Sequence, residues 1–244
     1  GSLSGTNNTA IGNSALKLNT TGGSNVAIGN SALSVNTTGS NNISMGIYSL
    51  LNNVSGANNT AVGAAALASN TTSNNTAVGT NAAYSNTSGS AITAIGFNSL
   101  YFNTTGFHNT GLGRETLEAN TTGIYNTAAG MTALTANTTG NYNSAFGVGA
   151  LQNNTTASNN TAIGYQAGYT TNGDSGTFLG HQAGRNNTAN NTVFIGYQTG
   201  YNNTGSSNTA VGFLSFNANT TGTSNTTLGR ESLKANTTGV NNIA

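Results

Sequence analysis

The chain has 244 residues but only five Lys and Arg and four Asp and Glu, with a net charge of +1. This near-neutral balance argues against a nucleic-acid partner, because phosphate binding needs clustered Lys and Arg. Direct membrane insertion is not expected either, since no apolar run approaches the ~20 residues that span a bilayer. The abundance of Asn, Thr and Gly alone would favour disorder. The periodicity of the sequence instead favours an ordered repeat fold.

A short phrase, N-T-A-I-G with small variations, recurs along the whole chain. We call its closing residue the motif glycine, and it stands at Gly12, Gly29, Gly46, Gly63, Gly79, Gly96, Gly113, Gly130, Gly147, Gly164, Gly180, Gly196, Gly212 and Gly229. The spacing is 17 residues, except for 16 from Gly63 to Gly79 and between Gly164 and Gly212. We therefore expect a single uninterrupted tandem-repeat solenoid over residues 1–244, an excerpt of a longer array.

Three residues before each motif glycine have strand character. The last is always apolar, the middle one is small, and the first is Thr, Val, Ile or Ser. This pattern predicts short strands with alternating faces at 9–12, 26–29, 43–46, 60–63, 76–79, 93–96, 110–113, 127–130, 144–147, 161–164, 177–180, 193–196, 209–212 and 226–229. Strands this short must stack on the copies in neighbouring coils. The expected fold is an all-β parallel β-solenoid (β-roll) with about 17 residues per coil and about 14 coils.

Three further columns complete each coil. Leu usually follows four residues after the motif glycine, which gives a second apolar stretch, and the two stretches are expected to close a thin core. Asn stands seven residues after and four residues before the motif glycine in most copies. Asn tolerates left-handed backbone and bonds nearby backbone groups, and stacked Asn side chains form amide ladders. The glycine of N-T-T-G, as at Gly22 and Gly106, is expected to supply positive φ.

N-T-A-I-G followed by A-L and N-T-T-G resembles the head repeats of YadA-type trimeric autotransporter adhesins, and related repeats in phage tail fibres. The resemblance covers essentially the whole chain. It implies a left-handed parallel β-roll in which three identical chains pack side by side, in an extracellular fibrous adhesin or fibre shaft.

Catalytic chemistry is nearly absent from the sequence. Glu115 and Glu118 lie three residues apart around a corner, but the equivalent later positions hold Glu231 and Lys234. A glycosidase needs two carboxylates facing one sugar bond, so we interpret these as surface charges. Calcium-binding β-roll repeats need recurrent Asp, whereas Asp174 is alone. We expect no enzyme, no cofactor and no metal site.

Three consecutive copies read G-Y-Q-A-G-Y, G-H-Q-A-G-R and G-Y-Q-T-G-Y. They define an aromatic–amide strip of Tyr165, Gln166, Tyr169, His181, Gln182, Arg185, Tyr197, Gln198 and Tyr201. One hypothesis is a shallow surface that contacts glycans. The alternative is stacked rings and amides that stabilise coils of 16 residues.

The same coils exchange residue sizes at two other positions. Gly168, Gly184 and Gly200 replace the usual Leu, while Phe178 and Phe194 replace the usual Ala. A large-for-small exchange at both positions predicts that these two columns touch.

N-x-[ST] sequons are frequent and would permit glycosylation in a competent host. Candidate positions are Asn19, Asn36, Asn70, Asn103, Asn120, Asn137, Asn154, Asn219 and Asn236. This column is ambiguous, because an inward amide ladder cannot carry a sugar. The hydroxyls of the N-T-T loops are an alternative place for O-linked sugars, and a sugar coat would keep so uncharged a chain in solution.

The leading function is a non-enzymatic extracellular structural fibre or adhesin shaft on a cell surface or virion. Its expected partner is itself, as a homotrimer by resemblance or an end-to-end filament. The alternatives are a glycan-binding repeat module and a glycan-coated single-chain filament. An ice-binding solenoid is less favoured, because only one Thr column within the strand is regular.

Overall fold

A computed structural model describes residues 5–244, which form two compact units, 5–125 and Asn126–Ala244, considered separately below. The first unit contains β1 (Thr9–Ile11), β2 (Val26–Ile28), β3 (Ile43–Met45), β4 (Thr60–Val62), β5 (Thr76–Val78), β6 (Thr93–Ile95) and β7 (Thr110–Leu112). The second contains β8 (Thr127–Ala129), β9 (Ser144–Phe146), β10 (Thr161–Ile163), β11 (Thr177–Leu179), β12 (Val193–Ile195), β13 (Thr209–Val211) and β14 (Thr226–Leu228). Residues 5–244 include no helix, and so none that is long and apolar enough to cross a membrane.

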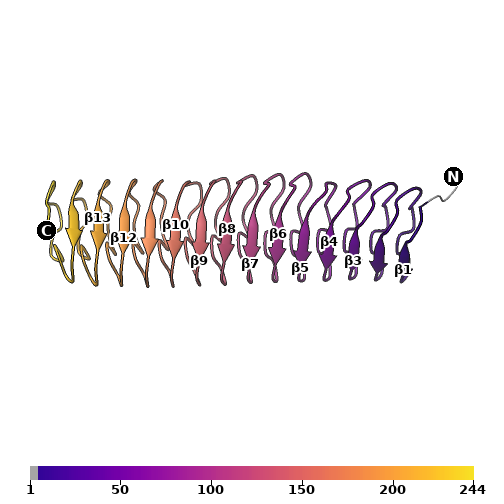
Figure 1. Cartoon of the computed structure of the whole chain (residues 1–244), viewed down its shortest axis with the longest axis horizontal. Coiled ribbons are helices and arrows are strands. Elements are labelled where there is room, and N and C mark those ends of the chain that lie inside the picture. The colour runs from indigo at the N-terminus through magenta and orange to yellow at the C-terminus, as the bar shows by residue number, and fades with distance from the viewer. Residues whose placement is uncertain (1–4) are drawn as a thin grey trace. The chain divides into compact units, whose positions relative to one another are not determined.

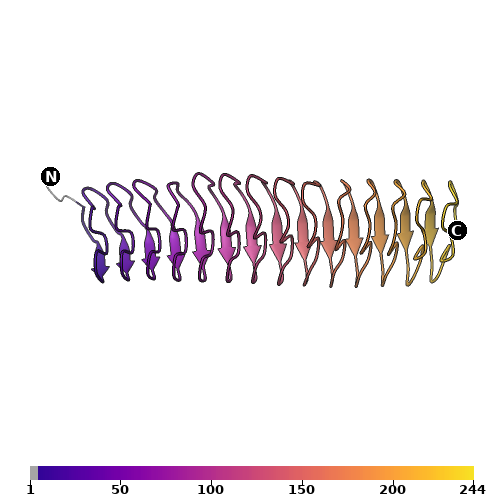
Figure 2. The same cartoon turned by 180° about the vertical axis from the view of Figure 1, so that it is seen from behind.

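Within each unit, every strand pairs in parallel with the strand of the next coil. Equivalent positions face each other, as where Ala61 lies opposite Ala77. Figures 1 and 2 show one short arrow per coil, with the rest of the coil returning as loop. The predicted all-β parallel β-solenoid is confirmed, and the left-handed coiling implied by the resemblance stays a prediction. Each strand ends one residue earlier than expected, because the motif glycine turns the chain with φ near +130° at Gly79.

The coils also bond to each other outside the strands. Leu33 N–H donates to Ser49 O, and Leu50 N–H donates to Ala66 O, both at 3.0 Å. Buried backbone groups must find partners, and here the neighbouring coil supplies them on the wall opposite the strand as well.

The core is thin, as the sequence predicted. In the strands, the middle residue is buried from β2 onward, and it is most often Ala, as at Ala61 and Ala94. The Leu column is buried against it, as at Leu100. The apolar residue before the motif glycine points outward instead, and Ile95 exposes 40% of its surface. The alternation of faces predicted for the strand is confirmed, because only its middle residue is buried.

The glycine of N-T-T-G does not supply positive φ, contrary to expectation; neither Gly22 nor Gly106 has it. These glycines are needed because their coils approach closely. A Cβ on Gly106 would clash with the carbonyl oxygen of Gly123 in the next coil, and it would lie 2.5 Å from Asn103 Oδ1 and 2.9 Å from Asn109 Nδ2. Any side chain here would displace the buried amides.

Left-handed backbone occurs instead two and four residues after the motif glycine and five residues before it. Examples are Asn98 (φ 53°), Leu100 (φ 54°) and His108 (φ 55°). The two inward Asn columns do not take this conformation. The prediction that Asn stands there because it tolerates left-handed backbone was therefore wrong. A non-glycine residue in this region costs about 1–2 kcal/mol, and a buried Leu there is held by its packing.

Asparagine ladders run through the core, as the stacked columns predicted. Asn103 donates from Nδ2 to Asn86 Oδ1 at 2.8 Å, and its Oδ1 accepts from Asn120 Nδ2 at 2.8 Å. In the second Asn column, Asn25 Oδ1 accepts the backbone N–H of Asn42 at 3.0 Å. All five side chains are fully buried. Burying a polar group without a partner is costly, so each coil depends on its neighbours for its own polar groups.

The ladder predicts a large stability difference between two adjacent residues. Asn53 is buried and donates to Asn36 Oδ1 at 3.1 Å and to Gly56 O at 2.9 Å, while Asn52 is exposed. Asn53→Ala is expected to lower the free energy of unfolding by about 2–4 kcal/mol, because it leaves buried partners unsatisfied. Asn52→Ala should change it by less than about 0.5 kcal/mol. Urea unfolding followed by circular dichroism measures both, and equal effects would refute a structural ladder.

The left-handed positions predict opposite signs for one substitution at neighbouring alanines. Ala65 has φ 55°, its neighbour Ala64 lies outside the left-handed region, and both are half-exposed. Ala65→Gly should raise the free energy of unfolding by about 1 kcal/mol, since glycine adopts positive φ without steric cost. Ala64→Gly should lower it by about 0.5–1 kcal/mol through backbone entropy. Thermal unfolding of the two variants beside the parent chain tests the difference, and effects of the same sign would contradict it.

Candidate functional site

The aromatic–amide strip lies in the second unit, and its first column is a stack of rings. The ring centroids of Tyr165 and His181 are 5.1 Å apart, as are those of His181 and Tyr197. The stack continues to Phe213, 5.2 Å from Tyr197, and the Arg230 guanidinium lies 5.5 Å from the Phe213 ring centroid. Sequence reasoning missed these last two residues. The signal was available, because both directly follow a motif glycine, as the other three do.

The second column is an amide ladder. Gln182 donates from Nε2 to Gln166 Oε1 at 3.0 Å, and Gln198 donates to Gln182 Oε1 at 2.8 Å. All three residues have positive φ, between 49° and 54°. The side chains are half-buried, so the ladder lies along the surface beside the rings.

The third column holds an arginine between two tyrosines. The Arg185 guanidinium lies 4.9 Å from the ring centroid of Tyr169 and 5.7 Å from that of Tyr201. Its Nε donates to Gln166 Oε1 at 3.1 Å, which links this column to the amide ladder. Cation–π contacts of this kind are worth about 0.5–2 kcal/mol. The structure thus brings all nine predicted residues of the strip into three stacked columns.

This geometry limits how the strip can contact a sugar. A sugar ring packs its C–H groups on the face of an aromatic ring, where the negative part of the quadrupole lies. The faces of His181 and Tyr197 are covered on both sides by neighbouring rings. Tyr165 and Tyr197 are exposed by 47% and 42%. Neighbouring rings stack on both faces of Tyr197 and on one face of Tyr165. The arrangement favours the alternative, in which stacking stabilises the coils, and glycan contact stays a prediction.

Beneath the strip, the two exchanged columns touch as predicted. A Cβ on Gly168 would lie 2.7 Å from a ring carbon of Phe178, and a Cβ on Gly200 would lie 2.6 Å from the ring of Phe194. Both phenylalanines are fully buried. Each ring therefore occupies the space that the Leu side chain fills in other coils.

The candidate glycosylation column faces inward. Asn36, Asn70, Asn103, Asn120, Asn137, Asn154 and Asn219 are fully buried, Asn19 is 8% exposed, and Asn236 is half-buried. Their Nδ2 atoms, which would carry a sugar, donate hydrogen bonds within the core. The folded chain thus favours the ladder over N-linked sugar at these nine positions. The N-T-T loops remain accessible, since Thr105 is exposed, while the hydroxyl of Thr104 donates to Thr121 O at 3.0 Å.

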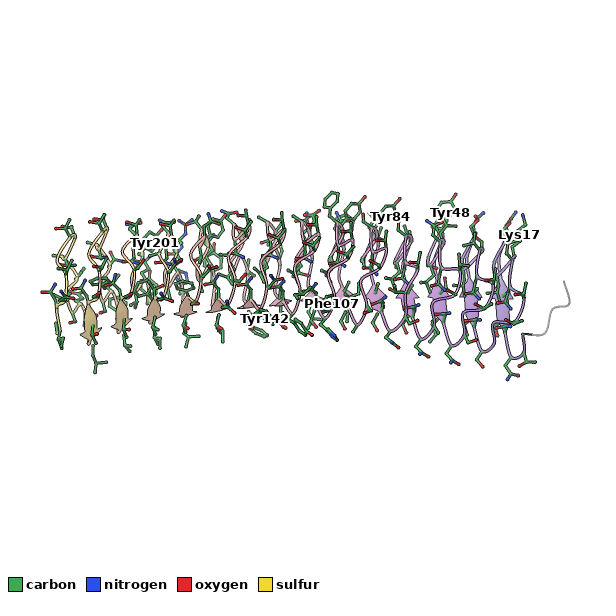
Figure 3. All side chains as sticks on the ribbon, turned by 90° about the horizontal axis from the view of Figure 1, so that it is seen from above. Lys17, Tyr48, Tyr84, Phe107, Tyr142 and Tyr201 are labelled. Carbon is green, nitrogen blue, oxygen red and sulfur yellow. The ribbon has the colours of Figure 1, made fainter. Side chains whose placement is uncertain are left out.

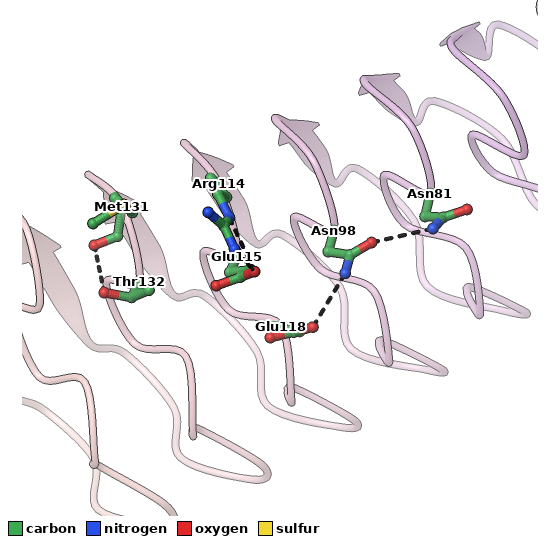
Figure 4. A network of polar contacts seen from close by, with 7 residues as sticks. All are labelled: Asn81, Asn98, Arg114, Glu115, Glu118, Met131 and Thr132. Atoms are coloured by element: carbon green, nitrogen blue, oxygen red, sulfur yellow. Dashed lines mark hydrogen bonds and ion pairs between the residues drawn. The ribbon is translucent and has the colours of Figure 1, made fainter.

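The acidic residues take part in local polar contacts (Figure 4). Arg114 Nη2 lies 2.7 Å from Glu115 Oε1 in an ion pair, and Asn98 Nδ2 donates to Glu118 Oε1 at 3.4 Å. Burial, and then the charge of Glu115, raise the pKa of Glu118 above its ordinary value. Asp174 Oδ1 accepts the backbone N–H of Ser158 at 2.7 Å. Within residues 5–244, no three His, Cys, Asp or Glu side chains gather in a way that could hold a metal ion.

Comparison with models of known protein families finds no match for this chain. Comparison with curated proteins finds none either. The fold itself defines the class, a tandem-repeat parallel β-solenoid, and the particular function rests on the surfaces described here.

The ring stack predicts a stability effect without a binding effect. Tyr197→Ala removes two ring contacts of about 0.5–1.5 kcal/mol each and should lower the free energy of unfolding by about 1–3 kcal/mol. Tyr48, similarly exposed and projecting from the coil edge (Figure 3), provides the control. Tyr48→Ala should cost less than about 0.5 kcal/mol.

Glycan binding of the same two variants and of the parent chain is measured on a glycan array. Glycan binding lost only with Tyr197→Ala, without a matching loss of stability, would restore the strip as a glycan site.

Proposed function

We propose that the chain is a section of a non-enzymatic extracellular fibre or adhesin shaft, in which copies associate side by side through the outer face of their strands. The class of structural repeat protein follows from the fold. The extracellular setting and the three-chain arrangement are carried by the resemblance to YadA-type head repeats. The outer strand face supports the association.

The observation that carries this proposal is an apolar outer face on each unit. The residue before the motif glycine points outward throughout, and Ile95 and Leu112 each expose 40%. The position after the motif glycine adds further exposed apolar side chains, including Ile47 and Phe97. Contiguous exposed apolar patches mark interaction surfaces. Neither of the outward positions of the strand carries a charged residue in any copy, whereas the position after the motif glycine carries Arg114 and Arg230.

A second copy of the chain is the occupant that fits this face. The outward side chains recur once per coil, at the ~4.8 Å separation of paired strands. A partner must repeat at the same distance to contact every coil equally, and a parallel copy does so by construction. A partner without that repeat would match one coil and miss the next.

A glycan-coated single-chain filament is the main competitor. The buried ladder disfavours sugars on the nine candidate asparagines, while exposed hydroxyls such as that of Thr105 leave room for O-linked sugars. Sugars on those loops are compatible with lateral association through the strand face. The mass per particle distinguishes the two proposals, because lateral association gives a multiple of the chain mass and a single-chain filament does not.

Multi-angle light scattering of the purified chain tests the proposal. The parent should have about three times the 24.3 kDa of one chain. Ile95→Lys places a charge on the outer face and should yield monomers with unchanged far-ultraviolet circular dichroism, because burying an unpaired charge is costly. Phe102→Lys is the control, since Phe102 is exposed by 50% but lies outside the strand. A monomeric parent at micromolar concentration would overturn lateral association.

A further inference from the structure

Three buried polar atoms without a partner belong to two successive coils of the second unit, at a position that we call the step. They are Asn154 Oδ1, Asn160 Nδ2 and Thr171 Oγ1, and all three residues are fully buried. Native structures leave very few buried polar groups unpaired. A fourth such atom, Thr192 Oγ1, lies farther along the second Asn column and is not part of this group.

The three atoms occur where the first asparagine ladder is interrupted. Thr171 takes the position that Asn holds in the neighbouring coils, at Asn154 and Asn187. Bonds on both sides place residue 171 opposite residue 154: Asn153 N–H to Tyr169 O at 2.9 Å, and Thr155 Oγ1 to Asn172 Oδ1 at 3.4 Å. Along the ladder elsewhere, the Asn of the next coil donates to the side-chain oxygen of the Asn before it, but the shorter Thr171 side chain lacks that amide nitrogen.

The orientation of both amides is fixed by their other bonds. Asn154 Nδ2 donates to Asn137 Oδ1 at 2.9 Å and to Ala157 O at 3.0 Å, so its oxygen must face the interruption. Asn160 Oδ1 accepts the backbone N–H of Gly176 at 2.7 Å, so its nitrogen is the group left over. Flipping either amide would break a bond that the structure makes. In another coil of the second unit the same two Asn columns lie within hydrogen-bonding distance, since Asn208 Nδ2 donates to Asn203 Oδ1 at 3.0 Å. Asn160 and Asn154 occupy these two columns, so the step presents one acceptor, one donor and one hydroxyl.

We propose that a single structural water molecule binds at this step. It accepts from Asn160 Nδ2, donates to Asn154 Oδ1, and makes its third bond with the Thr171 hydroxyl. Buried waters typically make about three such bonds to groups that otherwise lack a partner. A cation is disfavoured because the Asn160 N–H would point at it, and an anion because the Asn154 oxygen would.

The water takes the role of the amide nitrogen that Thr171 does not supply. The ladder resumes beyond it, where Asn203 donates to Asn187 Oδ1 at 2.8 Å. The Asn187 and Asn203 side chains are also buried in coils that carry the buried phenylalanines and the replacing glycines. An Asn at position 171 is therefore compatible with such surroundings, and Thr171→Asn is the matched variant.

High-resolution maps of the parent chain and of Thr171→Asn test the proposal. The parent should show one isolated peak at hydrogen-bonding distance, about 2.7–3.2 Å, from all three atoms. In Thr171→Asn the peak should be lost and the new amide should donate to Asn154 Oδ1. Absence of the peak in the parent, or its persistence in the variant, overturns the proposal. So does a peak with contacts shorter than about 2.5 Å to several oxygens, which is the geometry of a bound cation.

A second measurement needs only the parent chain and guards against a variant that fails to fold. In magnetic resonance spectra of the assembled protein, the Asn160 side-chain amide should show a cross-peak to a slowly exchanging water. The Asn143 amide donates to Ala157 O at 2.9 Å and should show none. A cross-peak at both amides, or at neither, contradicts a localised water.

Discussion

Hydrogen bonding of each buried group to the coil before or after it is the constraint on which the rest of this structure depends. The strands are three residues long and cannot stand alone. The core asparagines also reach beyond their own coil, as Asn103 does toward Asn86 and Asn120. A coil removed from the stack would leave polar groups without partners on both sides. Stability is therefore a property of neighbouring pairs of coils, as in other one-dimensional repeat folds.

That constraint explains the small residues. A Cβ on Gly96 would lie 2.5 Å from the carbonyl carbon of Gly113 in the next coil. The strand contributes mostly Ala to the interior, because a larger residue needs space from the Leu position opposite. Where Phe178 takes the Ala position, Gly168 and Gly184 replace Leu beside it. Larger core side chains are thus accommodated by exchange within a pair of columns.

Much of this architecture was predictable from the sequence, because the repeat gives every column many independent copies. Coil length, parallel strands, amide ladders and the Phe–Gly exchange were all predictable. The direction in which Ile95 points was not, since an apolar residue in a strand favours either the core or an interface. The positive φ at Leu100 was also not predictable, because propensity disfavours Leu there and only packing holds it. For the aromatic–amide strip, the three columns were predictable from the sequence. The covering of the ring faces was not, because it depends on the side-chain orientation of His181 and Tyr197.

The direction of the asparagine ladder has an electrical consequence. In the first unit, the amides from Asn36 to Asn120 each donate toward the preceding coil, so their dipoles align. Aligned hydrogen-bonded groups polarise one another, and the column acquires a positive pole toward β1 and a negative pole toward β7. Other bonds between coils run the opposite way, since Asn42 Nδ2 donates to Gly56 O and Leu33 N–H donates to Ser49 O, both in the following coil. The polarity therefore belongs to this ladder, and two such columns meeting head to tail attract, while two meeting head to head repel. Within the ladder, chain direction is expressed as the direction in which the amides donate.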